Sequence, residues 1–193
     1  MTRRFLDTLA KPVIGAARDA AGIGDHWSEK EADLPRDRFT AQEAAFIRAR
    51  DSFYMASMSR SGWPYIQHRG GPKGFLRQLD DQTLGFIDFA GNRQYLTVGN
   101  VSGEDRVALF LMDYPNRRRL KILAHATIRD LAADPALTAM LATPGYRGRP
   151  ERAVMLKLHA FDWNCSQHIT PRFTEAERLT AETDCRPPPE RGQ

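Results

Sequence analysis

The chain has 193 residues, of which 41% are hydrophobic and 27% are charged, a composition typical of a soluble globular protein rather than a disordered one. Its formal net charge of +4 is too small an excess to indicate nucleic-acid binding, and basic residues cluster in only one short run, at 117–121. Apolar runs fall short of the roughly 20 residues that span a bilayer. We therefore expect neither a nucleic-acid partner nor a membrane partner.

Cysteine and histidine spacing argues against a metal site and a disulfide. No Cys-x-x-Cys or His-x-x-x-His pattern occurs in the sequence, so we expect no bound metal. The two cysteines, Cys165 and Cys185, need not be paired because no secretion signal is evident. Asp7, Pro12 and Asp19 interrupt any signal-peptide core at the basic N-terminus. The cytoplasm is the expected location, with a mitochondrial presequence as the alternative.

Residues 1–38 are predicted to form a helical extension and a connector. Phe5, Leu9 and Val13 recur at helical spacing, which indicates a helix over residues 2–21, bent at Pro12. Residues 22–38 are polar and charged, as expected of a linker. A second helix should begin after Thr40 and run to about residue 50, because Thr40 and Glu43 form a capping-box pattern.

Strands dominate the middle of the chain. Alternating or apolar runs predict six of them, at 52–59, 63–69, 83–89, 106–114, 119–130 and 152–163. Short helices are expected after Asn92, ending near Gly103, and at 134–141. Strands and helices do not alternate regularly along the chain, as they would in a parallel α/β fold. We therefore predict a mainly β (α+β) fold, a six-stranded antiparallel barrel with short flanking helices over residues 39–175. Residues 176–193 should form a partly disordered tail.

The segment Gly91–Tyr95 follows an apolar strand and carries three polar side chains in a row. Asn92 suits the N-cap of the following helix. A helix N-terminus presents free N–H groups, and Arg93 adds a planar fork of donors, so the pair is suited to a phosphate. An ordinary capped helix with a solvent-facing arginine accounts for the same residues.

A second polar segment, 67–74, ends the predicted 63–69 strand with Gln67, His68 and Arg69, followed by glycines from Gly70 onward. Glycine backbone allows a ligand ring to approach closely, Arg69 could contact a phosphate, and His68 could titrate near neutral pH. A glycine turn with polar edge residues is the alternative. In the basic run, alternation places Arg117, Arg119 and Lys121 on one strand face, either solvated or facing an anionic ligand.

The segment 161–173 combines aromatic and polar residues, including Trp163, Gln167 and His168, in a way that suggests contact with a planar ligand. A Cys–His nucleophile pair is not supported, because neither an orienting third group nor an oxyanion hole can be recognised. No dinucleotide-binding glycine pattern and no phosphate-binding P-loop appear.

In their order along the chain, these strands, helices and polar segments resemble those of the pyridoxamine 5′-phosphate oxidase-like FMN-binding split-barrel family. The likeness is greatest to its flavin-nucleotide-binding branch, in which "HRGGP", "GNRQY" and "WNC-x-QHITPRF" occur together, and it covers roughly residues 40–175. The resemblance implies a split barrel that binds FMN, and a homodimer with the cofactor at the subunit interface.

The resemblance also implies a set of cofactor contacts. The phosphate would lie near Asn92, Arg93 and Gln94, and the backbone of Ile87 and Asp88 would lie against the flavin. The first cofactor segment corresponds to Gln67, His68, Arg69 and Gly70. A polar hairpin residue corresponds to Arg119 or its neighbour Arg118, and a cation there would favour the reduced flavin. The aromatic residue that the partner subunit provides corresponds to Trp163, with Gln167 and His168 following it. The candidates for proton donors or substrate contacts are His68 and His168.

One departure separates this sequence from true pyridoxamine phosphate oxidases, which carry an Arg-x-His-x-Arg segment after the late tryptophan. Here that place reads "SQHITPRFT", so the substrate is not carried over. The leading hypothesis is a flavin-dependent oxidoreductase of unknown substrate, with a small-molecule electron donor such as NAD(P)H. The alternatives are a non-catalytic flavin carrier or sensor, and a related fold that binds haem or a deazaflavin.

Overall fold

The computed structural model describes residues 4–9, 12–22, 36–163 and 165–184. The strands in this part of the chain are β1 (Ser52–Met58), β2 (Pro64–Gly70), β3 (Arg77–Asp80), β4 (Thr83–Phe89), β5 (Arg106–Asp113), β6 (Arg118–Arg129) and β7 (Pro150–Trp163). The helices are α1 (Arg4–Leu9), α2 (Pro12–Ala20), α3 (Ala41–Arg48), α4 (Leu96–Gly103), α5 (Pro135–Leu141) and α6 (Glu175–Asp184). Cys185 and the predicted disordered end of the tail lie outside the described residues.

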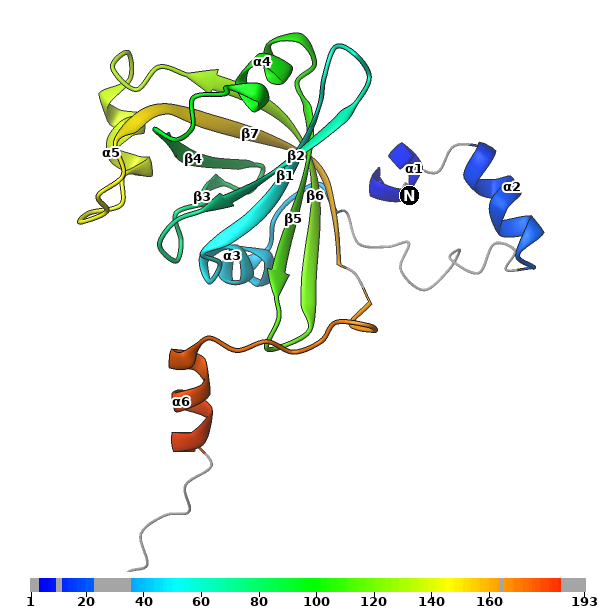
Figure 1. The fold of residues 1–193 in the computed structure, drawn as a ribbon. Coiled ribbons are helices and arrows are strands. Elements are labelled where there is room, and N and C mark those ends of the chain that lie inside the picture. Colours follow the sequence, from blue (N-terminus) through cyan, green and yellow to red (C-terminus); the bar gives the residue numbers. More distant parts are fainter. Residues whose placement is uncertain (1–3, 10–11, 23–35, 164, 185–193) are drawn as a thin grey trace, which may run out of the picture.

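The strands form one antiparallel sheet in the order β2-β1-β5-β6-β7-β4-β3, which curls into an open barrel (Figure 1). The predicted mainly β antiparallel fold is confirmed. The described strands number seven rather than the predicted six, because β3 was missed. Its four residues, "RQLD", are mostly polar and do not alternate, so they carry no strand pattern.

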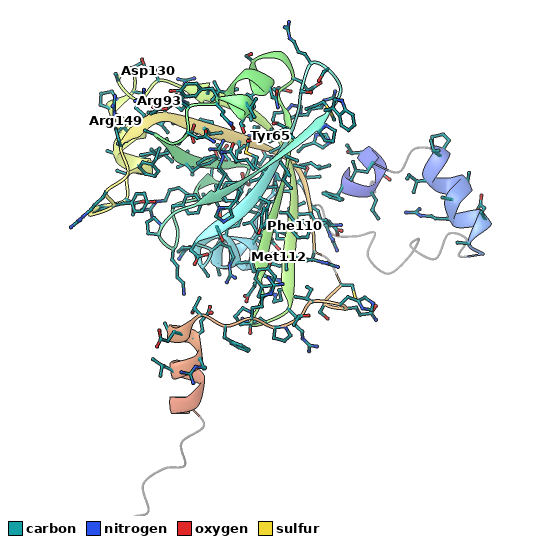
Figure 2. All side chains as sticks on the ribbon, in the orientation of Figure 1. Tyr65, Arg93, Phe110, Met112, Asp130 and Arg149 are labelled. Atoms are coloured by element: carbon teal, nitrogen blue, oxygen red, sulfur yellow. The ribbon has the colours of Figure 1, made fainter. Side chains whose placement is uncertain are left out.

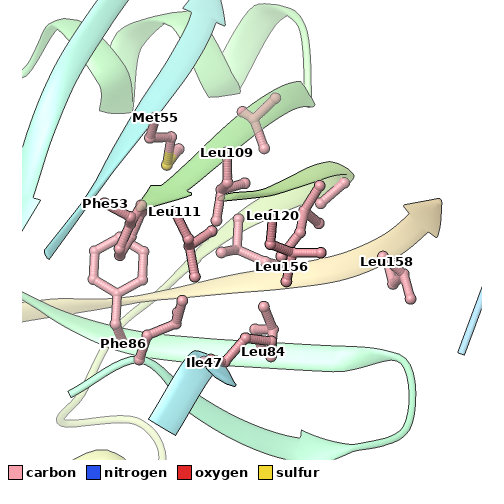
Figure 3. Packing of buried hydrophobic residues seen from close by; sticks show 14 of the residues in the cluster. Ile47, Phe53, Met55, Leu84, Phe86, Leu109, Leu111, Leu120, Leu156 and Leu158 are labelled. Atoms are coloured by element: carbon pink, nitrogen blue, oxygen red, sulfur yellow. The ribbon is translucent and has the colours of Figure 1, made fainter. Parts of the chain in front are cut away.

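The barrel core is filled by residues that alternate along the strands. Leu109 and Leu111 of β5 face Leu120 and Ile122 of β6, and all four are almost completely buried. Aromatic rings of β1 and β4 complete this cluster, as Figure 3 shows for Phe53 and Phe86. The period-two burial in β5 and β6 matches the alternation seen in the sequence.

The helices α3 and α4 lie at opposite ends of the barrel (Figure 1). The predicted capping box at the start of α3 is present, because the Glu43 carboxylate accepts the Thr40 N–H at 2.9 Å and the Thr40 hydroxyl accepts the Gln42 N–H at 3.2 Å. On the outside of β4, α5 covers a second, small apolar cluster that includes Ile87 and Leu141.

The N-terminal extension differs from the single bent helix that the sequence predicted. The structure has two helices, and Pro12 is the first residue of α2, a position where its missing N–H costs no hydrogen bond. Helix α1 packs on β7. Its Phe5 is buried under the ammonium group of Lys121, which lies 4.8 Å from the ring centroid.

Candidate functional site

A cavity of about 220 Å³ opens between β2, the end of β4 and the start of α4. It brings together three segments that are far apart in the sequence. Six of the predicted cofactor-binding residues line it: Gln67, Arg69, Asp88, Asn92, Arg93 and Gln94. The two polar segments singled out in the sequence therefore meet in one place.

The β2 wall of the cavity follows from strand alternation. Tyr65, Gln67 and Arg69 face the cavity, whereas His68 points to the opposite face of the sheet. The side chain of Gln67 is held by helix α4, because the hydroxyl of the buried Thr97 donates to its Oε1 at 3.0 Å. This bond ties β2 to the first turn of α4.

Arg69 and Asp88 form a buried ion pair beside the cavity. The Arg69 Nη1 lies 2.6 Å from the Asp88 Oδ1, and the two side chains are only 12% and 13% exposed. The Nε of Arg69 is buried as well, yet it has no hydrogen-bond partner within the described part of the chain. An unpaired buried donor is costly, so a ligand acceptor that reached this N–H would offset that cost.

The loop before α4 corrects the predicted helix start. Helix α4 begins at Leu96, not after Asn92, and its N-cap residue is Tyr95. The Asn92 side chain instead accepts the Gln94 N–H at 3.2 Å, one of the local turns by which Asn competes with helix formation. Arg93 and Tyr95 have φ values of 60° and 52°, left-handed conformations that keep the loop out of the helix.

The true start of α4 also faces the cavity. Among the described residues, no side chain caps the helix at Tyr95, and Leu96, Thr97 and Val98 of the first turn line the cavity wall. The free N–H groups of a helix's first turn carry partial positive charge and attract anions. The helix end that the sequence placed at Asn92 therefore faces the cavity three residues later than predicted, with Tyr95 as its N-cap residue.

Arg93 lies at the exposed mouth of this cavity, as Figure 2 indicates near α4. It pairs with no carboxylate in the part of the chain that the structure describes. Arg69, by contrast, is already neutralised by Asp88. Arg93 is therefore the cation of the cavity whose charge is not balanced by a neighbour, and the one best placed to attract an anionic group.

The β7 wall was missed by the sequence analysis. Glu151 lines the cavity, and its carboxylate pairs with Arg152 at 2.7 Å. The Arg152 guanidinium lies 4.6 Å from the centre of the Tyr95 ring. Both residues stand at the start of β7. The predicted strand began at Arg152 and did not include Glu151, and no signal in the sequence marked either residue as part of a site.

Three predicted site residues do not line the cavity. The exposed His68 lies across the sheet, edge-on to the Tyr54 ring at 5.6 Å. Ile87 points into the apolar cluster under α5, and Gly70 ends β2 beside the backbone of Asp51. For Ile87 the prediction concerned only its backbone, which pairs with Ala153 of β7.

Four other predicted residues lie at the opposite end of the barrel. Trp163 is the last residue of β7, eleven positions after Arg152, which along a strand is of the order of 30 Å. Arg119 is at the start of β6, where it is paired with Met112. Gln167 and His168 are exposed in the segment that follows β7. These four residues do not meet the cavity of their own chain.

Trp163 is held by α3. Its indole N–H donates to the buried Glu43 carboxylate at 2.7 Å, and its ring packs edge-on to Phe46 at 4.8 Å. Burial raises the pKa of the Glu43 carboxyl, but hydrogen bonds from Thr40 and Trp163 outweigh burial and hold that pKa below its usual value. The indole therefore rests on an ionised carboxylate.

The structure separates Arg118 from Arg119. The Arg118 guanidinium stacks over Trp163 at 4.5 Å, whereas Arg119 lies on the outer face of the sheet beside Met112. The Nε of Arg119 is buried and has no partner among the described residues. The sequence analysis named both arginines as candidates for the polar residue that contacts the flavin. Of the two, Arg119 is the one with an unsatisfied donor.

The outer face of β2, β1, β5 and β6 carries a group of apolar side chains, with the charged Arg119 and Lys121 beside them on β6. We define this apolar face by five residues whose strand pairings place them on one side: Tyr54, Ile66, Phe110, Met112 and Leu123. Figure 2 shows Phe110 and Met112 along β5. Ile66 is 64% exposed, and exposed apolar side chains gathered on one face are typical of an interaction surface.

Two further observations concern metal ions and membranes. In the described residues, no group of three or more His, Cys, Asp or Glu side chains could hold a metal ion. Among the helices within those ranges, none is both long enough and apolar enough to cross a membrane.

A family model described as pyridoxamine 5′-phosphate oxidase matches residues 39–160. A candidate pyridoxamine 5′-phosphate oxidase from Lactobacillus delbrueckii has a similar structure, with 19% identity and a TM-score of 0.51, over 67% of this chain and 97% of that chain. HupZ from Group A Streptococcus is 14% identical with a TM-score of 0.50, over 70% of this chain and 100% of that chain. Both likenesses show the fold alone. No curated protein matches the chain.

Proposed function

The chain belongs to the pyridoxamine 5′-phosphate oxidase family, and from this premise we propose that it is an FMN-binding flavoprotein whose cavity at the start of α4 holds the cofactor's phosphate. The observation that carries the proposal is the meeting of three anion-binding features in one cavity. These are the unpaired buried Nε of Arg69, the exposed Arg93 and the uncapped first turn of α4.

The residues present fit a phosphate monoester. Its oxygens would accept hydrogen bonds from Arg93, from the Arg69 Nε and from the N–H groups of the helix start. Gln67 and Asn92 add amide groups for the hydroxyls of the ribityl chain. FMN supplies hydride or electron transfer when bound, and the protein supplies binding, orientation and electrostatics.

We further propose that two copies of the chain form the complete site. A cavity of about 220 Å³ is smaller than the 300–1,000 Å³ typical of ligand pockets, so it suits the phosphate end of FMN rather than the whole cofactor. Arg119 and Trp163 lie at the other end of the barrel, and the apolar face lies between. A two-fold dimer through this face would bring these residues to the partner's cavity.

We propose an oxidoreductase activity because the family is named for an oxidase. Arg119, supplied by the partner, would place a cation beside the flavin and so favour its reduced state. The missing Arg-x-His-x-Arg segment argues against vitamin B6 phosphates as substrates. One observation favours a non-catalytic carrier or sensor instead: among the described residues that line the cavity there is no histidine to move a proton.

The test is an absorbance spectrum of the purified protein, followed by titration of the apoprotein with FMN. The proposal expects flavin bands whose chromophore, released by denaturation, has the mass of FMN. Protein that neither carries flavin nor takes up added FMN would rule out both the enzyme and the carrier. Oxidation of NAD(P)H by the FMN-loaded protein would then separate the enzyme from the carrier.

A further inference from the structure

Arg152 does not line the cavity, but it contacts the residues that build its two sides. The guanidinium lies behind the wall, with its side chain only 17% exposed. It pairs with Glu151 at 2.7 Å, lies 4.0 Å from the Asp88 carboxylate and stacks over the Tyr95 ring at 4.6 Å. One side chain thus spans β7, β4 and the loop before α4.

The contact with Asp88 leads to Arg69. Asp88 Oδ1 holds the Arg69 Nη1 at 2.6 Å, while Asp88 Oδ2 faces Arg152. A carboxylate held between two guanidinium groups keeps one orientation. Asp88 holds the Arg69 guanidinium through Nη1, and the same guanidinium carries the Nε that has no partner among the described residues.

The contact with Tyr95 leads to Arg93. Tyr95 joins the loop to α4 in a left-handed conformation, with φ of 52°. Its ring stacks on Arg152, and its hydroxyl donates to Glu151 at 3.4 Å. A strained backbone conformation persists when surrounding contacts hold it, and these two contacts come from β7.

We propose that Arg152 is a positioning residue for the phosphate, which it never touches. It aligns Arg69 through Asp88 and the Arg93 loop through Tyr95, so that donors from β2 and from the loop converge on one anion. This inference rests on the proposed FMN site. It also has an electrostatic part, because loss of Arg152 leaves the Glu151 carboxylate unpaired beside the cavity.

Because riboflavin lacks the phosphate, the ratio of FMN to riboflavin affinity reports on the phosphate contacts alone. We expect Arg152→Met to lower that ratio about tenfold, with riboflavin affinity changed less than twofold. Arg152→Lys, which keeps the charge but not the planar stack, should recover less than half of the loss on a logarithmic scale. The control is Arg129→Ala, on the opposite face of the neighbouring strand, where Arg129 is paired with Ala153.

A double-mutant cycle separates positioning from general destabilisation. Arg93→Ala should reduce FMN affinity tenfold or more in the native background, but less than threefold in the Arg152→Met background, because Arg93 is then no longer aligned. Equal Arg93 effects in both backgrounds, or full rescue by Arg152→Lys, would overturn the inference. Wild-type protein that binds FMN no better than riboflavin would instead refute the proposed phosphate site itself. Melting curves identify variants that fail to fold, and for these Arg152→Gln replaces Arg152→Met.

Discussion

The carboxylate of Asp88 lies 2.6 Å from the guanidinium of Arg69, and the pair is buried beside the cavity that we assign to a phosphate. The pair has two opposing effects on an anionic ligand. Asp88 orients Arg69, but it also neutralises the arginine and places a negative charge near the phosphate. Replacement of the carboxylate by an amide separates the two effects.

We expect Asp88→Asn to tighten FMN binding by about three- to tenfold, since the amide oxygen still accepts from Arg69 while the negative charge is lost. Riboflavin binding should not change. Fluorescence titration of apoprotein with both ligands measures the difference, and Asp130→Asn, outside the cavity, is the control. A large loss of FMN affinity would show that the orientation of Arg69 outweighs its charge.

Arg93→Ala should weaken FMN binding by about tenfold to a hundredfold, because one charge-assisted hydrogen bond contributes roughly 1.5–3 kcal/mol. Riboflavin affinity and melting temperature should stay near their native values, since Arg93 is exposed. The same titration with Arg129→Ala controls for the loss of an exposed arginine. Unchanged FMN affinity would mean that the phosphate lies elsewhere.

Phe110→Asp tests the dimer through the apolar face. Two-fold symmetry places the introduced carboxylate on both sides of the interface, where burial of an unpaired charge is costly. We expect dimer dissociation to increase at least about a hundredfold, with weaker FMN binding as a consequence. Sedimentation measures the first effect. Met140→Asp, at an exposed site on α5, should leave the association state unchanged, and a Phe110→Asp variant with the native association state would contradict the proposed interface.

Glu43→Gln tests the carboxylate beneath Trp163. At pH 7 we expect a loss of about 1–3 kcal/mol of unfolding free energy, because charge-assisted bonds from Thr40 and Trp163 are weakened. The pKa of Glu43 is lowered in the folded protein, so its contribution is present above the ordinary carboxyl pKa. It is lost as the pH falls through the lowered folded value. Urea unfolding at several pH values should show the two proteins converging in acid, and a constant difference would contradict this account.

Much of the barrel could be predicted from the sequence because its strands alternate regularly. The leucines of β5 and the apolar residues of β6 show a period of two, and a capping box marks α3. The β3 strand escaped prediction because it pairs through its backbone while its side chains are polar. The start of α4 was predicted too early because the Asn92 side chain accepts the N–H of Gln94 within the loop and does not cap the helix. An asparagine can make either hydrogen bond, and residue spacing does not show which one forms.

The lining of the candidate cavity was predictable in part. Gln67, Arg69, Asp88 and the loop residues could be named because a family motif carries them. Glu151 and Arg152 could not, since their role depends on which strand lies beside β4, and that is a property of the sheet order. His68 lies outside this cavity because neighbouring residues of a strand point to opposite faces, and Gln67 and Arg69 occupy the cavity face.

The measurement that tests the central claim most directly is the affinity of the wild-type apoprotein for FMN compared with riboflavin. The two ligands differ only in the phosphate, so their ratio measures what the cavity at α4 contributes. The account predicts that FMN binds at least about tenfold more tightly. Equal affinity for the two ligands would contradict it.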